Sequence, residues 1–173
     1  HEWKNNQSHS CFNNKTKGKV LIMDSKDIKK LKDLLYNENN TNLSKEVINM
    51  ETPLMLHVLA ANYNWDNGFE IPNLIINNKN CDLGTALLMF YNADGFRFLE
   101  SGDTDYPKSL SKWKDFMTNL FHRIKNNNFK SQSISYTPQI SKVQMFKLKK
   151  INPNIPNIFF ERSPGIEVDI PVL

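Results

Sequence analysis

Residues 54–61 constrain the fold more than any other stretch, because almost every side chain in them is apolar. A surface helix keeps a polar side, whereas a helix that is apolar all round has to be buried on several sides. Thr52 and Pro53 precede the run, and proline suits the first turn of a helix because its missing N–H has no helical partner there. The sequence therefore predicts a central helix that begins at Pro53 and ends before the Asn-rich turn at residues 64–68.

A second apolar run, at residues 83–91, lies a short distance further along the chain. Asp82 precedes it and is expected to cap a helix, which an Asp-Gly dipeptide then ends. Between the two runs, Pro72 suits the first turn of a helix over residues 73–78. Three helices joined by loops of roughly three to six residues favour antiparallel neighbours in a bundle or a stack.

Helical periodicity continues on both sides of this centre. An amphipathic helix is expected after Asp24, and a short one from Ser44. Apolar residues at spacings of three and four then indicate a long helix with a buried stripe of Leu110, Trp113, Phe116, Met117, Leu120, Phe121 and Ile124. A further helix is predicted after Pro138, and its apolar side would consist of Ile140, Val143, Phe146, Leu148 and Ile151.

The expected fold class is mainly all-α, as a compact bundle or a short HEAT-like stack of antiparallel helices. Short extended segments are expected near residues 19–23, 133–136 and 166–173. Residues 1–19 are polar and show no periodicity, so they are interpreted as a flexible N-terminal arm. The remaining residues, 20–173, have the length of a single helical domain with a full core.

The charges are divided unevenly along the chain. Residues 51–106 carry eight acidic and two basic side chains, whereas residues 107–150 carry ten basic and one acidic. The two blocks either face one another inside the fold or present oppositely charged surfaces to a partner. The candidate acidic rim consists of Asp66, Glu70, Asp94, Asp103 and Asp105. The candidate basic face consists of Lys112, Lys114, Arg123, Lys142, Lys147 and Lys149.

The basic block also contains Trp113, Phe129 and Tyr136, a combination that nucleic-acid-binding proteins use for phosphate contacts and base stacking. The alternative is an ordinary solvated basic face, because most of these aromatic residues fall on the apolar stripes. Nucleic acid is therefore the second candidate partner.

The turn between the apolar runs reads Tyr-Asn-Trp-Asp-Asn-Gly-Phe-Glu from residue 63 to residue 70. Trp65 and Phe69 are expected to anchor neighbouring helices, and Gly68 to close the turn. Asp66 and Glu70 are either groups that recognise a partner or caps of orphan N–H groups at helix starts.

Catalysis and metal binding find little support in the residue pattern. His57 lies in the first apolar run, and the positions three and four residues on are Ala60 and Ala61, so no second metal ligand follows. We expect a buried histidine, no catalytic residue, no metal and no cofactor. A small hydrolase around His57, Asp66 and Glu70 is kept as an alternative that requires an open polar cleft.

No run approaches the roughly 18 apolar residues of a membrane span, so no membrane partner is expected. The two cysteines, Cys11 and Cys81, do not form a disulfide framework and are expected to be free thiols. Both features favour a cytoplasmic protein.

The segment from Leu56 to Leu99 resembles the bacterial domain-of-unknown-function family 4274. The residues that carry the resemblance are the Tyr-Asn-Trp-Asp-x-Gly-Phe-Glu string, the Cys-Asp-Leu-Gly-Thr-Ala-Leu string from residue 81, and Phe-Tyr-x-Ala-Asp-Gly from residue 90. Residues 142–161 are similar to the family's usual C-terminal extension. Where the family is expected to have an acid, this chain has Asn67.

This resemblance implies a bacterial origin and a small helical domain without an established activity. By analogy with small bacterial domains of this kind, we expect an immunity protein whose partner is a cognate toxin. Such a protein would display a charged, aromatic-edged patch that occludes the toxin's active site.

Overall fold

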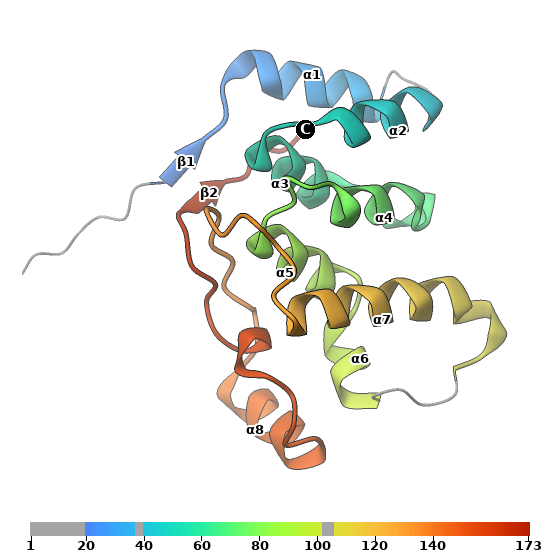
Figure 1. Cartoon of the computed structure of the whole chain (residues 1–173), viewed down its shortest axis with the longest axis vertical. Helices are drawn as coiled ribbons and strands as arrows, with labels where there is room; N and C mark the ends of the chain where they lie inside the picture. Colours follow the sequence, from blue (N-terminus) through green and yellow to red (C-terminus); the bar gives the residue numbers. More distant parts are fainter. Residues whose placement is uncertain (1–19, 37–39, 102–105) are drawn as a thin grey trace, which may run out of the picture.

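The computed structural model describes residues 20–36, 40–101 and 106–173, which form eight α-helices (Figure 1). These are α1 (Ser25–Tyr36), α2 (Asn40–Asn49), α3 (Pro53–Asn62), α4 (Glu70–Asn77), α5 (Leu83–Asn92), α6 (Gly95–Ser101), α7 (Ser111–Lys125) and α8 (Lys142–Ile151). The short elements are the strands β1 (Val20–Ile22) and β2 (Glu167–Asp169) and the 3-10 turns η1 (Trp65–Asn67), η2 (Lys108–Leu110) and η3 (Asn157–Phe159). The mainly helical fold class is confirmed. The proposed arm at residues 1–19 lies outside the described residues.

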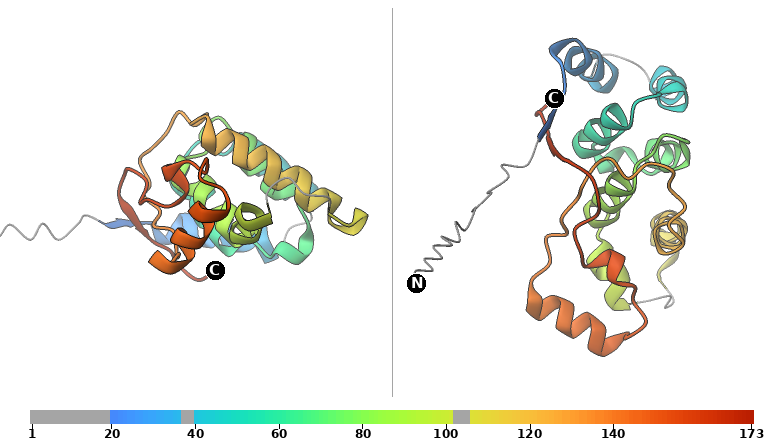
Figure 2. Two further views of the ribbon diagram at one scale, coloured as in Figure 1. Left: turned by 90° about the horizontal axis from the view of Figure 1, so that it is seen from below. Right: turned by 60° about the vertical axis from the view of Figure 1, so that its left-hand side comes forward.

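The helices are arranged in two columns. One column contains α1, α3 and α5, and the other contains α2, α4 and α7, as the right-hand view of Figure 2 shows. Helix α3 packs against α1 on one side, α5 on the other and α4 across the columns, so the predicted stack of helices is confirmed. This position explains why residues 54–61 are apolar all round, because Leu56, Val58 and Leu59 have no exposed surface.

Helix α5 is buried in the same way. It contacts α3, α6 and α7, and every side chain from Leu83 to Phe90 is buried. The side chain of Asp82 caps it by accepting a hydrogen bond from the Gly84 N–H at 2.9 Å, as the sequence predicts. The two apolar runs of the sequence are therefore the two helices at the centre of the stack.

The carboxylate of Asp82 also holds a segment that lies far away in the sequence. Asp82 is fully buried, and its Oδ2 atom accepts hydrogen bonds from the Ser131 hydroxyl at 2.6 Å and the Ser133 N–H at 2.7 Å. The Ser133 hydroxyl and the Ile134 N–H approach the same oxygen at 3.1 and 3.3 Å. Asp82 thus fixes the extended chain at residues 131–134 against the start of α5, a role that the sequence analysis did not foresee.

Gly84 allows this approach. A Cβ atom at position 84 would lie 2.1 Å from the carbonyl oxygen of Ile134, far inside van der Waals contact. Only glycine permits the backbone of residues 131–134 to lie so close to the first turn of α5.

The two described ends of the chain meet. Strands β1 and β2 pair in parallel, with Leu21 opposite Val168. Beyond β2, the Leu173 N–H donates to the side-chain oxygen of Asn62 at 3.1 Å, and the Tyr36 hydroxyl donates to the Leu173 carbonyl at 3.2 Å. The C-terminal segment therefore ties together α1 and α3, and the extended segments expected near 19–23, 133–136 and 166–173 are confirmed.

Some predicted boundaries and one predicted burial pattern are wrong. Helix α4 begins at Glu70 and not near residue 73, although Pro72 lies within its first turn as predicted. Helix α8 begins at Lys142 because Ser141 and Gln144 form a capping box. Of its predicted apolar stripe only Leu148 is buried, whereas the three side chains Val143, Phe146 and Ile151 are exposed.

Replacing Asp82 with asparagine should lower the free energy of unfolding by about 3 kcal/mol, because an amide group cannot accept from all the donors around Oδ2 and buried unpaired donors are costly. Urea unfolding followed by circular dichroism measures this change. Asp66→Asn is the matched control, since its exposed carboxylate makes no hydrogen bond to a described residue, and it should change stability by less than about 0.5 kcal/mol. Equal effects of the two substitutions would contradict the role assigned to Asp82.

Candidate functional site

The turn from Tyr63 to Glu70 is fixed by its own hydrogen bonds. The Asn64 side chain accepts from the Asp66 N–H at 3.1 Å, and the Gly68 N–H donates to the Trp65 carbonyl at 3.0 Å. Gly68 has a φ of 82°, which favours glycine, and its carbonyl accepts from the Tyr63 hydroxyl at 3.0 Å. Burial and the nearby Glu70 carboxylate raise the pKa of Tyr63, so this hydroxyl remains a donor at neutral pH.

The interpretation of Asp66 and Glu70 as helix caps is wrong. Asn64 caps η1, and α4 has Phe69 at its N-cap with no side-chain hydrogen bond. Asp66 is exposed and its carboxylate has no hydrogen bond to a described residue, while Glu70 accepts one from the Ser44 hydroxyl at 3.3 Å. The short Asn64 side chain reaches the N–H two residues on, as in other Asx turns.

Aromatic rings join this turn to helix α7. The ring centroid of Phe116 lies 5.9 Å from that of Trp65 and 5.2 Å from that of Phe69. Trp65 also meets Tyr63 edge to face at 5.9 Å. These contacts fix the position of the start of α4 relative to α7, and therefore the width of the space between the turn and α7.

A polar groove of about 560 Å³ opens between the turn and α7. We call it the motif groove, and it is lined by Asn67, Gly68, Phe69, Glu70, Asn73, Lys112, Asp115, Phe116 and Asn119. Phe69 and Phe116 supply apolar surface, and three asparagines supply amide groups. The side chain of Asn73 is held by its hydrogen bond to the Phe69 carbonyl at 2.8 Å.

The charges of the groove are not neutralised by close pairing. Glu70 comes from the acidic block, and Lys112 and Asp115 come from α7. Among the described residues, none of these three side chains has an ion-pair partner within 4 Å. The acidic and basic blocks therefore approach each other at the motif groove without forming an internal ion pair there.

The other predicted acidic residues are not gathered at this groove. Asp66 is the immediate neighbour of Asn67, whereas Asp94 is an exposed residue with a φ of 67° at the far end of α5. Asp103 and Asp105 lie outside the described residues. Asp115, Asn73 and Asn119 were missed by the sequence analysis, although Asp115 is recognisable as the single acid of the basic block.

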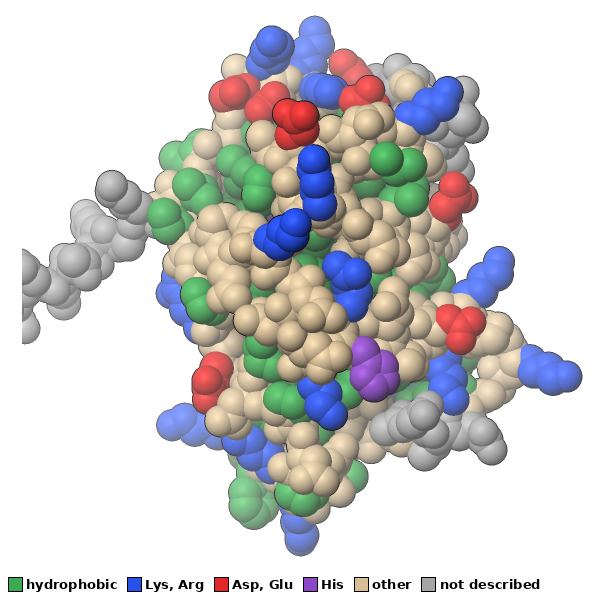
Figure 3. Space-filling view, in the orientation of Figure 1, with side chains coloured by type: hydrophobic (Ala, Val, Ile, Leu, Met, Phe, Trp, Pro, Cys, Tyr) green, Lys and Arg blue, Asp and Glu red, His purple; other side chains and the backbone are tan. Residues whose placement is uncertain are grey.

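The predicted basic residues do not form one continuous face. They belong to α7 and α8, which lie in different parts of the stack, and Figure 3 shows the Lys and Arg side chains scattered over this side of the molecule. Several are used internally. Arg123 lies over the Phe129 ring at 5.1 Å, Lys114 over Tyr106 at 5.8 Å, and Lys149 over Phe160 at 5.2 Å.

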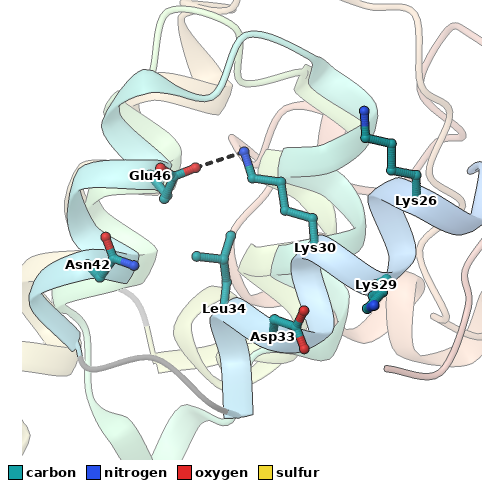
Figure 4. A pocket seen from close by; sticks show the side chains of 7 residues that line it. All are labelled: Lys26, Lys29, Lys30, Asp33, Leu34, Asn42 and Glu46. Carbon is teal, nitrogen blue, oxygen red and sulfur yellow. Dashed lines mark ion pairs between the residues drawn. The ribbon is translucent and has the colours of Figure 1, made fainter.

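A second hollow lies between α1 and α2 (Figure 4). Lys26, Lys29 and Lys30 line it together with Asp33 and Glu46, and Lys30 forms an ion pair with Glu46 at 2.8 Å. The ion pair between Lys30 and Glu46 neutralises part of the charge of this hollow, whereas the motif groove has no such ion pair among the described residues.

His57 lies apart from the motif groove. It is 2% exposed, and its Nδ1 atom lies 3.0 Å from the Thr85 hydroxyl of α5. Burial lowers the pKa of His57 to about 4, although the Asp82 carboxylate opposes the shift. No hydrogen bond joins His57 to Asp66 or Glu70, so within the described part of the chain these three residues do not form a connected set.

No group of three or more His, Cys, Asp or Glu side chains among the described residues could hold a metal ion. No helix within residues 20–36, 40–101 and 106–173 is long and apolar enough to cross a membrane.

The fold and the groove define a protein built as a stack of helices with a preformed polar groove between α4 and α7. Residues 51–125 match the model of the family described as Domain of unknown function (DUF4274), which confirms the predicted family over this segment. All residues that line the motif groove fall within the match. No curated protein and no solved structure matches the chain.

The buried neutral His57 should make stability depend on pH. Its pKa is about 6.5 in an unfolded chain and about 4 in the fold, so the unfolded state binds more protons between these values and stability falls as the pH falls. From pH 7 to pH 5 this contribution should be about 2 kcal/mol. Urea unfolding of His57→Asn should show a correspondingly smaller loss over this range, while the exposed His122→Asn should behave as the wild type. An identical pH dependence in His57→Asn would contradict the assignment.

Proposed function

We propose that the chain is a non-enzymatic protein-binding module of bacterial origin that acts as an immunity protein, neutralising a cognate toxin by occluding its active site. The observation that carries the proposal is the motif groove, where Glu70 and Asp115 lie beside an aromatic surface and have no ion-pair partner within 4 Å among the described residues. A lysine or arginine from a partner would gain two carboxylates and a ring face there.

The rigidity of the groove supports a binding role. Its walls are fixed by the hydrogen bond of Asn73, by the Tyr63 hydroxyl on the Gly68 carbonyl and by the packing of Phe69 on Phe116. A preformed site loses less conformational entropy when a partner binds, and more of the contact energy then appears as affinity.

Charge complementarity would also favour a basic partner. The two negative charges of Glu70 and Asp115 outnumber the single positive charge of Lys112. The exposed Asp66 adds a further negative charge beside the groove. Complementary charges of this kind increase the rate of association and select against partners of the wrong sign. A toxin that acts on nucleic acid carries such a basic surface around its active site, which makes it the best-matched class.

The expected partner is the product of a neighbouring gene that encodes a toxin domain. Co-expression and copurification of the two chains is the first test of the proposal. A stable complex that suppresses the toxin's activity is the expected result. Full toxin activity in the presence of excess chain, with no complex, would contradict it.

The surface of that complex can be tested by reversing the charges of the groove. Glu70→Lys with Asp115→Lys should weaken the complex by about a thousandfold, because each of the two lost charge contacts at a desolvated site costs about 2 kcal/mol or more. Isothermal titration calorimetry gives the dissociation constant. The control is Glu100→Lys with Glu161→Lys, which changes net charge equally at exposed positions outside the groove. Equal weakening by both pairs would mean that only net charge matters.

A second candidate function is nucleic-acid binding, favoured by the absence of any acidic residue between Asp115 and Glu161. It requires retention on DNA or RNA that falls steeply with salt and is lost when Lys142, Lys147 and Lys149 are changed to glutamate. Tight binding that is insensitive to these changes would remove this candidate.

A further inference from the structure

Helix α8 exposes large apolar side chains to solvent. Phe146 is 70% exposed, Val143 64% and Ile151 58%. The opposite side of the helix faces the protein, with Leu148 buried and Met145 packed against the core. Helix α8 lies at one end of the long axis of the molecule, where it contacts α6 (Figure 1).

The exposed side of α8 alternates apolar and cationic side chains in a regular way. At 3.6 residues per turn, residues four apart follow one row along a helix. Lys142, Phe146 and Lys150 form one such row, and Val143, Lys147 and Ile151 form the next. We call these two rows the α8 checkerboard, because each row alternates and the two rows are offset.

The lysines of the checkerboard are not neutralised by any residue that the structure describes. Lys142, Lys147 and Lys150 are exposed, and none has an ion pair or hydrogen bond to a described residue. The whole segment from residue 116 to residue 160 contains no aspartate or glutamate. In Figure 3 the end of the molecule that α8 forms shows blue and green side chains beside one another.

We infer that the α8 checkerboard docks the protein on an anionic lipid surface. In a bilayer interface, apolar side chains insert between headgroups while neighbouring lysines contact the lipid phosphates and keep their methylene stems in the apolar layer. Each lysine near such a surface strengthens binding about fivefold, so three lysines and three apolar side chains suffice for reversible binding. The expectation of no membrane partner was based on the lack of an apolar run long enough to span a bilayer. Docking on the surface of a bilayer does not need such a run.

The pattern fits lipid better than the two other anionic partners. A helix that packs into a protein groove places apolar anchors at positions i, i+3, i+4 and i+7, and counted from Val143 the last two of these positions are Lys147 and Lys150. Nucleic acid would satisfy the lysines and stack on Phe146, but it would leave Val143 and Ile151 exposed. The checkerboard is also distinct from the motif groove, so the inference does not depend on the proposed function.

The test is cosedimentation of the full chain with vesicles of phosphatidylcholine alone and of phosphatidylcholine with about one third phosphatidylglycerol. Binding is expected only to the anionic vesicles, and it should weaken with added salt. Lys147→Glu with Lys150→Glu should reduce the partition coefficient more than tenfold. Phe146→Ser with Val143→Ser should reduce it by a similar factor, because both insertions are lost.

Lys29→Glu with Lys32→Glu is the matched control, since it reverses two exposed lysines of α1 and should leave vesicle binding within about twofold of the wild type. Unchanged far-ultraviolet circular dichroism verifies that each variant is folded. No binding to anionic vesicles, or equal loss in the α1 control, would overturn the inference. Binding that survives the loss of Phe146 and Val143, with retention on an oligonucleotide that needs the lysines, would assign the surface to nucleic acid instead.

Discussion

The buried carboxylate of Asp82 connects parts of the fold that no local pattern connects. It caps α5 at Gly84 and also accepts hydrogen bonds from Ser131 and Ser133. The connection continues through Ile134, which bridges to Ile166 just before β2. Because β2 pairs with β1, this one carboxylate relates the centre of the stack to both described ends of the chain.

How far the fold could be predicted depends on whether a segment is buried on all sides. Helices α3 and α5 are apolar all round, so their central position followed directly from the sequence. Helix α8 shows the opposite case: its periodicity predicted a helix, but periodicity says only which residues share a side, not what that side contacts. Since only Leu148 of the predicted stripe is buried, the error concerned tertiary packing and not local structure.

Of the motif groove, the sequence predicted the turn at residues 63–70 but not the opposite wall, which α7 forms. The Asn-Gly dipeptide indicated the turn, but which side chain caps it depends on reach over one or two residues. Asn64 took the role assigned to Asp66, whereas the start of α4 has no side-chain cap in place of Glu70. Asp115 lies forty-five positions after Glu70, and the packing of Phe116 on Trp65 and Phe69 brings the two carboxylates to one groove. In the sequence, Asp115 stands out only through its negative charge, because every other charged residue of the basic block is positive.

The motif groove and the α8 checkerboard both carry charges without an ion-pair partner among the described residues, but they differ in how they are built and in what they imply. The motif groove is concave, mixed in charge and held by hydrogen bonds, and it lies wholly within residues 51–125 that match the family. The α8 checkerboard is an exposed helix side outside that match; its charged side chains are all positive, and on the opposite side of the helix Leu148 and Met145 pack against the core. A partner bound in the groove would meet specific geometry, whereas the checkerboard places few geometric demands on what it binds. Since the groove lies between α4 and α7 and α8 lies at the end of the molecule beside α6, both surfaces can be occupied at once, and a role for one leaves the role of the other open.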